Sequence, residues 1–257
     1  MTLQKLSLFR NSLLFTFATI LTVLMTALSM LFVFSGQKVK KSIQLKEGKR
    51  AFLANKENAL KFYKVFSAGY DFLNPQFYTG VMRGQIVDLV QGECLRVLDV
   101  GCGTGYTTEG LLGHEGVVEV VGLDMNSVQL GRASKKLHRK NNRVSFSRGD
   151  AENLPFGDNL FDVVVSIGAI EYFPDPDRAI FEMARVVKQG GLVVVGGPEY
   201  GWFRKVALDK FFYSPSMDET TEMLSKSGLK DEKSFLVGVK TIFGTGGYVI
   251  VGTGRKA

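Results

Sequence analysis

Cysteine and histidine are scarce in this chain of 257 residues, and each occurs only twice. Two cysteines, Cys94 and Cys102, are too few for a disulfide framework or a cysteine metal cluster. His114 and His138 lie far apart in the sequence and have no Cys, Asp or Glu partner at the spacing of metal ligands. Internal repeats and low-complexity tracts are also lacking, which argues against a repeat architecture. We therefore expect an ordinary globular chain without a metal site.

Charge is lacking between Arg10 and Lys38, where residues 13–34 read LLFTFATILTVLMTALSMLFVF. A bilayer core of ~30 Å needs ~20 apolar residues in a helix. The polar residues of the run leave no charged, solvent-facing stripe, so a buried core helix is the weaker alternative. A secretory signal peptide would have a shorter apolar region, and its best cleavage candidate, Ala27-Leu28-Ser29, falls inside the run. We therefore predict that residues 1–36 form an N-terminal membrane anchor.

Basic residues follow this run, and we predict that residues 37–51 form a juxtamembrane tether. Only Glu47 opposes its positive charges, which are Lys38, Lys40, Lys41, Lys46, Lys49 and Arg50. The positive-inside rule places the remaining chain on the cytoplasmic side, or on the stromal or matrix side of an organelle. Lysines near anionic headgroups contribute ~1 kcal/mol each. A membrane surface therefore explains the net charge of +7 better than nucleic acid does.

The remaining residues, about 200, suit one α/β domain with a helical extension before it. Residues 52–91 have helical periodicity with a break at Asn74-Pro75, and they predict two or three helices. From residue 92 to 257, apolar strands alternate with helices, which predicts a mostly parallel seven-stranded sheet covered on both faces. The last two strands form a hairpin, so one strand is antiparallel. We expect strands at 95–100, 118–123, 143–147, 160–167, 191–197, 233–238 and 247–253, and helices from Gly105, at 127–140, at 175–187 and at 216–229 with Ser216 as cap.

The segment Asp99-Val100-Gly101-Cys102-Gly103-Thr104-Gly105 follows the first strand and opens a helix. Open α/β sheets bind ligands in the crevice at this edge. A dinucleotide site has the spacing G-x-G-x-x-G, whereas the third glycine here comes one residue early. The carboxylate of Asp99 lies where a pyrophosphate would sit, and negative charge suits a cationic ligand better. S-adenosylmethionine, which carries an ammonium and a sulfonium, is such a ligand.

Two further carboxylates end the next two strands. Asp124 closes VVGLD, where it can accept hydrogen bonds from both ribose hydroxyls of an adenosine, and Met125 offers a soft surface for the base. Asp150 follows the third strand and is placed to accept from an adenine amino group. Any one of these could be a turn-forming aspartate. Their occurrence at successive strand ends, together with the glycine loop, favours an adenosine-containing ligand.

The segments VLDVGCGTGYTTEGL, VVGLDMN, GDAENLPF and FDVVVSIGAIEYFPDPDRAIFEMARVVKQGGLVVV resemble class I S-adenosylmethionine-dependent methyltransferases. The resemblance covers roughly residues 60–257 and implies the Rossmann-like fold of that class. It is greatest to the plant and archaeal-type 2-methyl-6-phytyl-1,4-benzoquinone methyltransferases, which methylate a quinone ring carbon. The resemblance implies that the loop contacts the methionine moiety, Asp124 the ribose and Asp150 with Ala151 the adenine. The full predicted cofactor set is Asp99, Gly101, Cys102, Gly103, Gly105, Asp124, Met125, Asp150, Ala151 and Ile167.

Residues that handle the methyl acceptor are expected after the fourth strand. Methylation of a hydroquinone carbon calls for a general base that accepts a phenolic proton. Glu171 and Tyr172 are the first candidates, and Glu199 and Tyr200 after the fifth strand are the second. Structural bracing by Glu171 and packing by Tyr172 are equally open. Cys102 is expected to pack within its loop and not to act as a nucleophile.

The sequence thus predicts a membrane-anchored methyltransferase that acts on a prenylated quinol. Nucleic acid is disfavoured because the chain lacks the Asn/Asp-Pro-Pro-aromatic motif of amino-directed methyltransferases. Two alternatives stay open. The acceptor could be another lipid-soluble molecule, such as a sterol or a phenolic oxygen, or the chain could be a membrane scaffold that has the fold without turnover.

Overall fold

The computed structural model describes residues 55–61, 80–137, 142–199, 213, 215–238 and 248–257. The predicted anchor, the basic tether, most of the helical extension and Tyr200 lie outside these ranges. No helix within them is both long enough and apolar enough to cross a bilayer. Of the predicted extension, the structure describes a helix at residues 56–61 and the helix α3 (Gly80–Val87).

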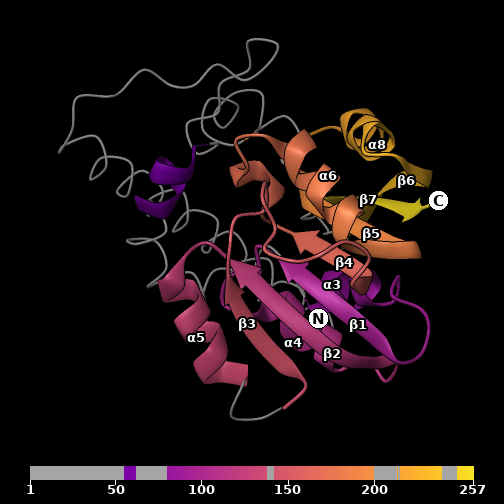
Figure 1. The fold of residues 1–257 in the computed structure, drawn as a ribbon. Helices are drawn as coiled ribbons and strands as arrows, with labels where there is room; N and C mark the ends of the chain where they lie inside the picture. Colours follow the sequence, from indigo (N-terminus) through magenta and orange to yellow (C-terminus); the bar gives the residue numbers. More distant parts are fainter. Residues whose placement is uncertain (1–54, 62–79, 138–141, 200–212, 214, 239–247) are drawn as a thin grey trace, which may run out of the picture.

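Seven strands form one sheet with the order β3-β2-β1-β4-β5-β7-β6 (Figure 1). Strands β1 to β5 run parallel to one another, and β7 is antiparallel to both β5 and β6. The predicted mostly parallel sheet with one antiparallel strand is therefore confirmed. The strands are β1 (Leu95–Val100), β2 (Val117–Asp124), β3 (Val144–Arg148), β4 (Phe161–Ile167), β5 (Val187–Glu199), β6 (Leu229–Gly238) and β7 (Tyr248–Lys256).

Helices cover both faces of this sheet. Alternate residues of β1 point to opposite faces, so Leu98 belongs to one hydrophobic cluster and Val97 to the other. The first cluster includes residues of α6 (Pro176–Val186) and α8 (Met217–Lys226). The second includes residues of α3, α4 (Tyr106–Leu112) and α5 (Ser127–Leu137). Two separate cores explain why the inner strands read as continuous apolar runs.

The predicted cap Ser216 is confirmed, whereas two strands begin several residues earlier than predicted. Asp175 caps α6 by accepting from the backbone N–H of Arg178 at 3.0 Å, and Ser216 forms a capping box with Glu219 at the start of α8. β5, however, begins at Val187, directly after α6, instead of at residue 191. β6 begins at Leu229 instead of at residue 233 because Gly228, with a φ of 82°, follows the end of α8 and turns the chain into the strand.

Candidate functional site

The loop between β1 and α4 turns sharply at Gly101. Its backbone N–H and that of Cys102 both donate to the carbonyl of Leu123 in β2, at 2.7 and 3.0 Å. Gly101 has a φ of 72°, and a Cβ at this position would lie 2.4 Å from the Cβ of Ala169 in the loop after β4. Only glycine fits here, because any side chain would push the two loops apart.

Asp124, at the end of β2, is tied to this loop. One of its carboxylate oxygens accepts from the backbone N–H of Gly103 at 2.9 Å, and the other accepts from that of Asn126 at 2.8 Å. Burial raises the pKa of Asp124, while these backbone donors oppose the shift. The carboxylate is thus held in a fixed orientation at the edge where β1 and β2 end.

Asp99, near the end of β1, and the loop residues Cys102 and Gly105 make contacts within the domain and do not line the pocket described below. The buried Asp99 carboxylate accepts from the hydroxyl of Thr108 in α4 at 2.6 Å. Burial, together with the neighbouring Asp99 and Asp124, raises the pKa of the Cys102 thiol well above its usual value, so the thiol stays protonated, as a packing role requires. A Cβ on Gly105 would lie 2.9 Å from a methyl of Leu137, so this glycine allows close packing against α5.

A pocket opens at the carboxyl ends of β1, β2 and β3, in front of this loop. Its empty space is ≈ 720 Å³, including open solvent at its mouth. Six residues from the predicted cofactor set line it, namely Gly101, Gly103, Asp124, Met125, Asp150 and Ala151. Residues Asp99, Cys102, Gly105 and Ile167 are not among its lining. Sequence reasoning thus identified residues from three separated segments that the fold brings together.

The pocket has further lining residues that the sequence did not point to. Gln129 lies in the first turns of α5, and its buried side-chain oxygen has no hydrogen-bond partner among the described residues. Glu152 lies two residues after Asp150 and also lines the pocket. Lys56 belongs to the helix of residues 56–61 and places its ammonium 2.6 Å from both Asp150 and Glu152. Glu152 was recognisable in principle from its place in the strand-end loop, whereas no sequence signal marks Lys56.

Among the described candidates for handling the acceptor, Tyr172 lines the pocket, whereas Glu171 and Glu199 do not. Tyr172, in the short helix η1 (Ile170–Tyr172) after β4, lines the pocket together with Ala169 and Phe173. Glu171, next to it, is buried and turned toward β5, where a Cβ on Gly197 would lie 3.5 Å from its Oε2. Glu199 ends β5, at the same edge of the sheet.

Burial determines the protonation of Glu171. Its Oε2 has no hydrogen-bond partner within the described part of the chain, and desolvation raises its pKa to about 8. The carboxyl group is therefore largely neutral at pH 7. A buried carboxyl group with a pKa raised in this way is a candidate functional group.

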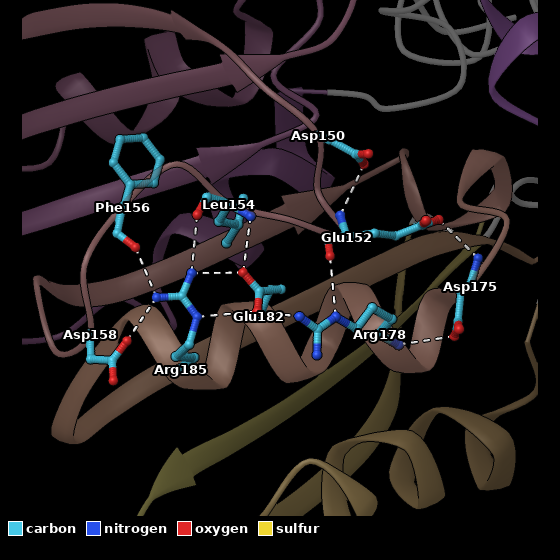
Figure 2. Close-up of polar contacts among 9 residues, drawn as sticks. All are labelled: Asp150, Glu152, Leu154, Phe156, Asp158, Asp175, Arg178, Glu182 and Arg185. Carbon is cyan, nitrogen blue, oxygen red and sulfur yellow. Dashed lines mark hydrogen bonds and ion pairs between the residues drawn. The ribbon is translucent and has the colours of Figure 1, made fainter.

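A polar network holds the loop after β3 against α6 (Figure 2). The guanidinium of Arg185 donates to the carbonyls of Leu154 and Phe156 at 3.0 and 2.8 Å and to Glu182 at 2.6 Å. The buried Glu182 also accepts from the backbone N–H of Leu154 at 3.0 Å. The hydrogen bond from Arg185 is the main cause of the lowered pKa of Glu182. Because Asp150 lies in this loop, the network also stabilises the part of the pocket wall that Asp150 forms.

The pocket residues suit S-adenosylmethionine. Carboxylates at two strand ends can accept from ribose hydroxyls and from an adenine amino group, and the orphaned oxygen of Gln129 offers a further acceptor. Gly101, Gly103 and Ala169 line this pocket with little side-chain bulk, which leaves room for a ligand in front of the loop. The strand order and the pocket at the carboxyl ends of the parallel strands resemble those of the class I methyltransferases.

Comparison with known proteins agrees with this class. Residues 98–195 match the family described as a methyltransferase domain. Among curated proteins, the chain is 37% identical over 194 residues to the chloroplastic 2-methyl-6-phytyl-1,4-hydroquinone methyltransferase 1 of Oryza sativa subsp. japonica, covering 74% of this chain and 58% of the relative. The chain thus spans little more than half the length of that relative.

Two more distant likenesses complete the comparison. Sterol 24-C-methyltransferase erg6 of Aspergillus fumigatus is 36% identical over 119 residues, which are 46% of this chain and 30% of that protein. The solved structure of the Haemonchus contortus phosphoethanolamine N-methyltransferase 2 with S-adenosyl-L-methionine has a TM-score of 0.61 at 17% identity, covering 80% of this chain and 59% of that one. At that identity the structural likeness shows the fold alone.

Proposed function

We propose that this chain transfers a methyl group from S-adenosylmethionine to a ring carbon of a prenylated hydroquinone. The observation that carries the proposal is a pocket with the acceptor groups for this cofactor in a chain 37% identical to a hydroquinone methyltransferase. Both parts are needed, because the fold alone hosts many acceptors.

The predicted cofactor residues have separate tasks in this proposal. Gly101 and Gly103 would leave room for the methionine part, with Asp99 behind them contributing negative charge. Asp124 would accept from the ribose hydroxyls, and Asp150 with Ala151 would contact the adenine next to Met125. The bound cofactor supplies an electrophilic methyl carbon on a sulfonium. The chain itself binds and orients, which accounts for much of the rate of an in-line transfer.

The acceptor must approach from the side of the loop after β4. A hydroquinone carbon becomes nucleophilic when a neighbouring phenol gives up its proton; the new carbon–carbon bond forms as the carbon–sulfur bond breaks, and the ring then loses the proton of the methylated carbon. Tyr172 lines this side of the pocket, and the buried Glu171 lies directly before it. We assign acceptor positioning to Tyr172 and proton acceptance to Glu171, whose pKa of about 8 is close to that of a useful base. Glu199 and Tyr200 are second candidates.

Membrane attachment is part of the proposal and rests on the sequence. A prenylated quinol stays in the bilayer, so an anchor at residues 13–34 and the basic tether after it would hold the enzyme where its acceptor is. The domain would then face the cytoplasm, the stroma or the matrix. Alkaline extraction of membranes tests this point. The full chain is expected in the pellet, and a chain without residues 1–36 is expected in the supernatant; a full chain released by alkali would contradict the anchor.

A second candidate function follows from the similarity to sterol 24-C-methyltransferase. That similarity, over 119 residues, is the basis of an alternative in which the acceptor is another lipid-soluble molecule and not a quinol. A non-catalytic scaffold is the remaining alternative, and absence of S-adenosylhomocysteine binding in calorimetry would favour it.

The decisive experiment offers both acceptors to membranes that contain the chain. Membranes are incubated with S-adenosylmethionine carrying a labelled methyl group and with either 2-methyl-6-phytyl-1,4-hydroquinone or a sterol, and the extracted lipids are analysed by mass spectrometry. We expect label on a ring carbon of the hydroquinone. Label on a hydroquinone oxygen, or on the sterol alone, would contradict the proposal.

A further inference from the structure

Glu152 connects three separate elements at the adenine end of the pocket, as Figure 2 shows for two of them. Its backbone N–H donates to Asp150 at 3.0 Å. One carboxylate oxygen accepts from the backbone N–H of Asp175 at 2.9 Å, and the Glu152 carbonyl accepts from Arg178 at 3.2 Å. The loop after β3 is thereby joined to the start of α6.

Lys56 provides the third connection. Its ammonium lies 2.6 Å from Asp150 Oδ2 and 2.6 Å from Glu152 Oε2, so one cation bridges two carboxylates. These carboxylates raise the pKa of Lys56 against the opposing effect of burial, which keeps the ammonium charged. Without it, two negative groups would face each other beside the pocket, and like charges this close destabilise the arrangement.

The helix that carries Lys56 also forms part of the pocket wall. Ala59 and Leu60 line the pocket, and Ala59 is almost fully buried. Asn55 caps this helix by accepting from the backbone N–H groups of Glu57 and Asn58, both at 3.1 Å. The helix therefore contributes an apolar surface next to the predicted adenine position, and Lys56 is its charged attachment to the sheet domain.

We propose that Lys56 and Glu152 are positioning residues that hold the helix of residues 56–61 over the adenine end of the cofactor pocket. Seating of the helix and binding of the cofactor are then coupled, and each stabilises the other by the same factor. The inference rests on the proposed cofactor site, but it concerns residues that the proposed reaction does not use.

Calorimetry with S-adenosylhomocysteine tests the coupling in the full chain. Lys56→Met keeps the aliphatic length and removes the charge. We expect it to raise the Kd about three- to tenfold, since two half-exposed ion pairs contribute modestly. Lys61→Met is the matched control, because Lys61 lies on the same helix, pairs with Glu57 and is not part of the pocket lining. Its Kd should stay within about twofold of the wild type, and Lys56→Arg should recover most of the lost affinity.

Hydrogen exchange gives a readout that a merely structural lysine would not change. In the wild type, S-adenosylhomocysteine should slow exchange of the amides of residues 56–61, and in Lys56→Met this protection should disappear. If Lys56→Met has an unchanged or lower Kd, or if the ligand still protects the amides of residues 56–61 in this variant, the inference is overturned and the proposed cofactor site is not affected. A wild-type chain that does not bind S-adenosylhomocysteine would instead overturn the proposed cofactor and the inference with it.

Discussion

Two buried glutamates, Glu171 before α6 and Glu182 within it, differ in their hydrogen-bond partners. Glu182 is 2% exposed and accepts hydrogen bonds from Arg178, Arg185 and the backbone of Leu154, and its pKa is lowered. Glu171 is 3% exposed, its Oε2 has no partner within the described residues, and its pKa is raised to about 8.

This difference underlies the proposed role of Glu171 as a base, in contrast to the structural role of Glu182. A buried acid with charged donors on both oxygens fixes its neighbours in place, which is what Glu182 does for the loop after β3. A buried acid without such donors destabilises the fold when it ionises, and such a cost is typical of groups retained for chemistry. The following substitutions test this distinction, and the largest expected effect comes first.

Glu171→Gln should abolish most of the methyl transfer while leaving the fold intact. Loss of a positioned base lowers kcat by about 100-fold or more. In the wild type, kcat should rise with pH up to about 8, where Glu171 becomes ionised, and the variant should lack this rise. The pH profile of kcat is measured by assays of labelled methyl transfer over a range of about pH 6–10, which covers the expected rise. A variant with wild-type kcat and pH profile would show that Glu171 is not the base.

The same variant should be more stable than the wild type in alkali. The pKa of Glu171 is about 8 in the folded chain against a usual 4.5, so the folded state binds the proton more tightly. Below 4.5 both states are protonated and nothing is lost; as the pH rises toward 8, only the unfolded chain ionises, and wild-type stability falls. Thermal unfolding at several pH values should show a gain for Glu171→Gln of a few kcal/mol near pH 8 that vanishes near pH 4. No gain would mean that an unseen donor already stabilises the carboxylate.

Arg185→Met should lower stability at neutral pH. It leaves Glu182 buried without its main donor and frees the carbonyls of Leu154 and Phe156, so the free energy of unfolding should fall by about 3 kcal/mol at neutral pH. The pKa of Glu182 is lowered in the folded chain, so ionised Glu182 stabilises the fold above its usual pKa. This stabilisation is lost as the pH falls through the pKa of the folded state, so the stability deficit of Arg185→Met should shrink in acid. Urea unfolding measures both effects.

The control for Arg185→Met is Lys188→Met, which breaks the more exposed ion pair with Asp162. It should cost less than about 1 kcal/mol. If both variants lose the same stability, the Glu182 network is no more than an ordinary surface contact and the contrast with Glu171 loses its basis.

Ser166→Ala should have the smallest effect. Ser166 lies in β4, shortly before Glu171, and its buried hydroxyl has no hydrogen-bond partner among the described residues. Because no bond is lost, the free energy of unfolding should change by less than about 0.5 kcal/mol. In urea unfolding, a fall in the free energy of unfolding of more than about 1–2 kcal/mol, the cost of a broken hydrogen bond, would reveal a hydrogen-bond partner of Ser166. The surroundings of Glu171 would then differ less from the hydrogen-bonded surroundings of Glu182.

Local sequence signals predicted most of the fold and six residues that line the pocket. The apolar runs of β1 and β4 and the cap Ser216 are encoded within a few residues, so their positions agree with the structure. Asp124 and Asp150 follow because parallel strands bring their carboxyl ends to one edge. The contacts of Lys56 and the orientation of Glu171 toward β5 depend on residues distant in the sequence, which no local pattern records.

The contact between Gly101 and Ala169 has a consequence for protein engineering. A Cβ on Gly101 would overlap that of Ala169. The loop predicted to bind the cofactor therefore packs tightly against the loop that precedes the acceptor-side residues. A designer who enlarges residue 169 to reshape acceptor choice would also displace the glycine loop. Under the proposed function, acceptor range and cofactor affinity would therefore change together, and mutant libraries should vary the two loops together.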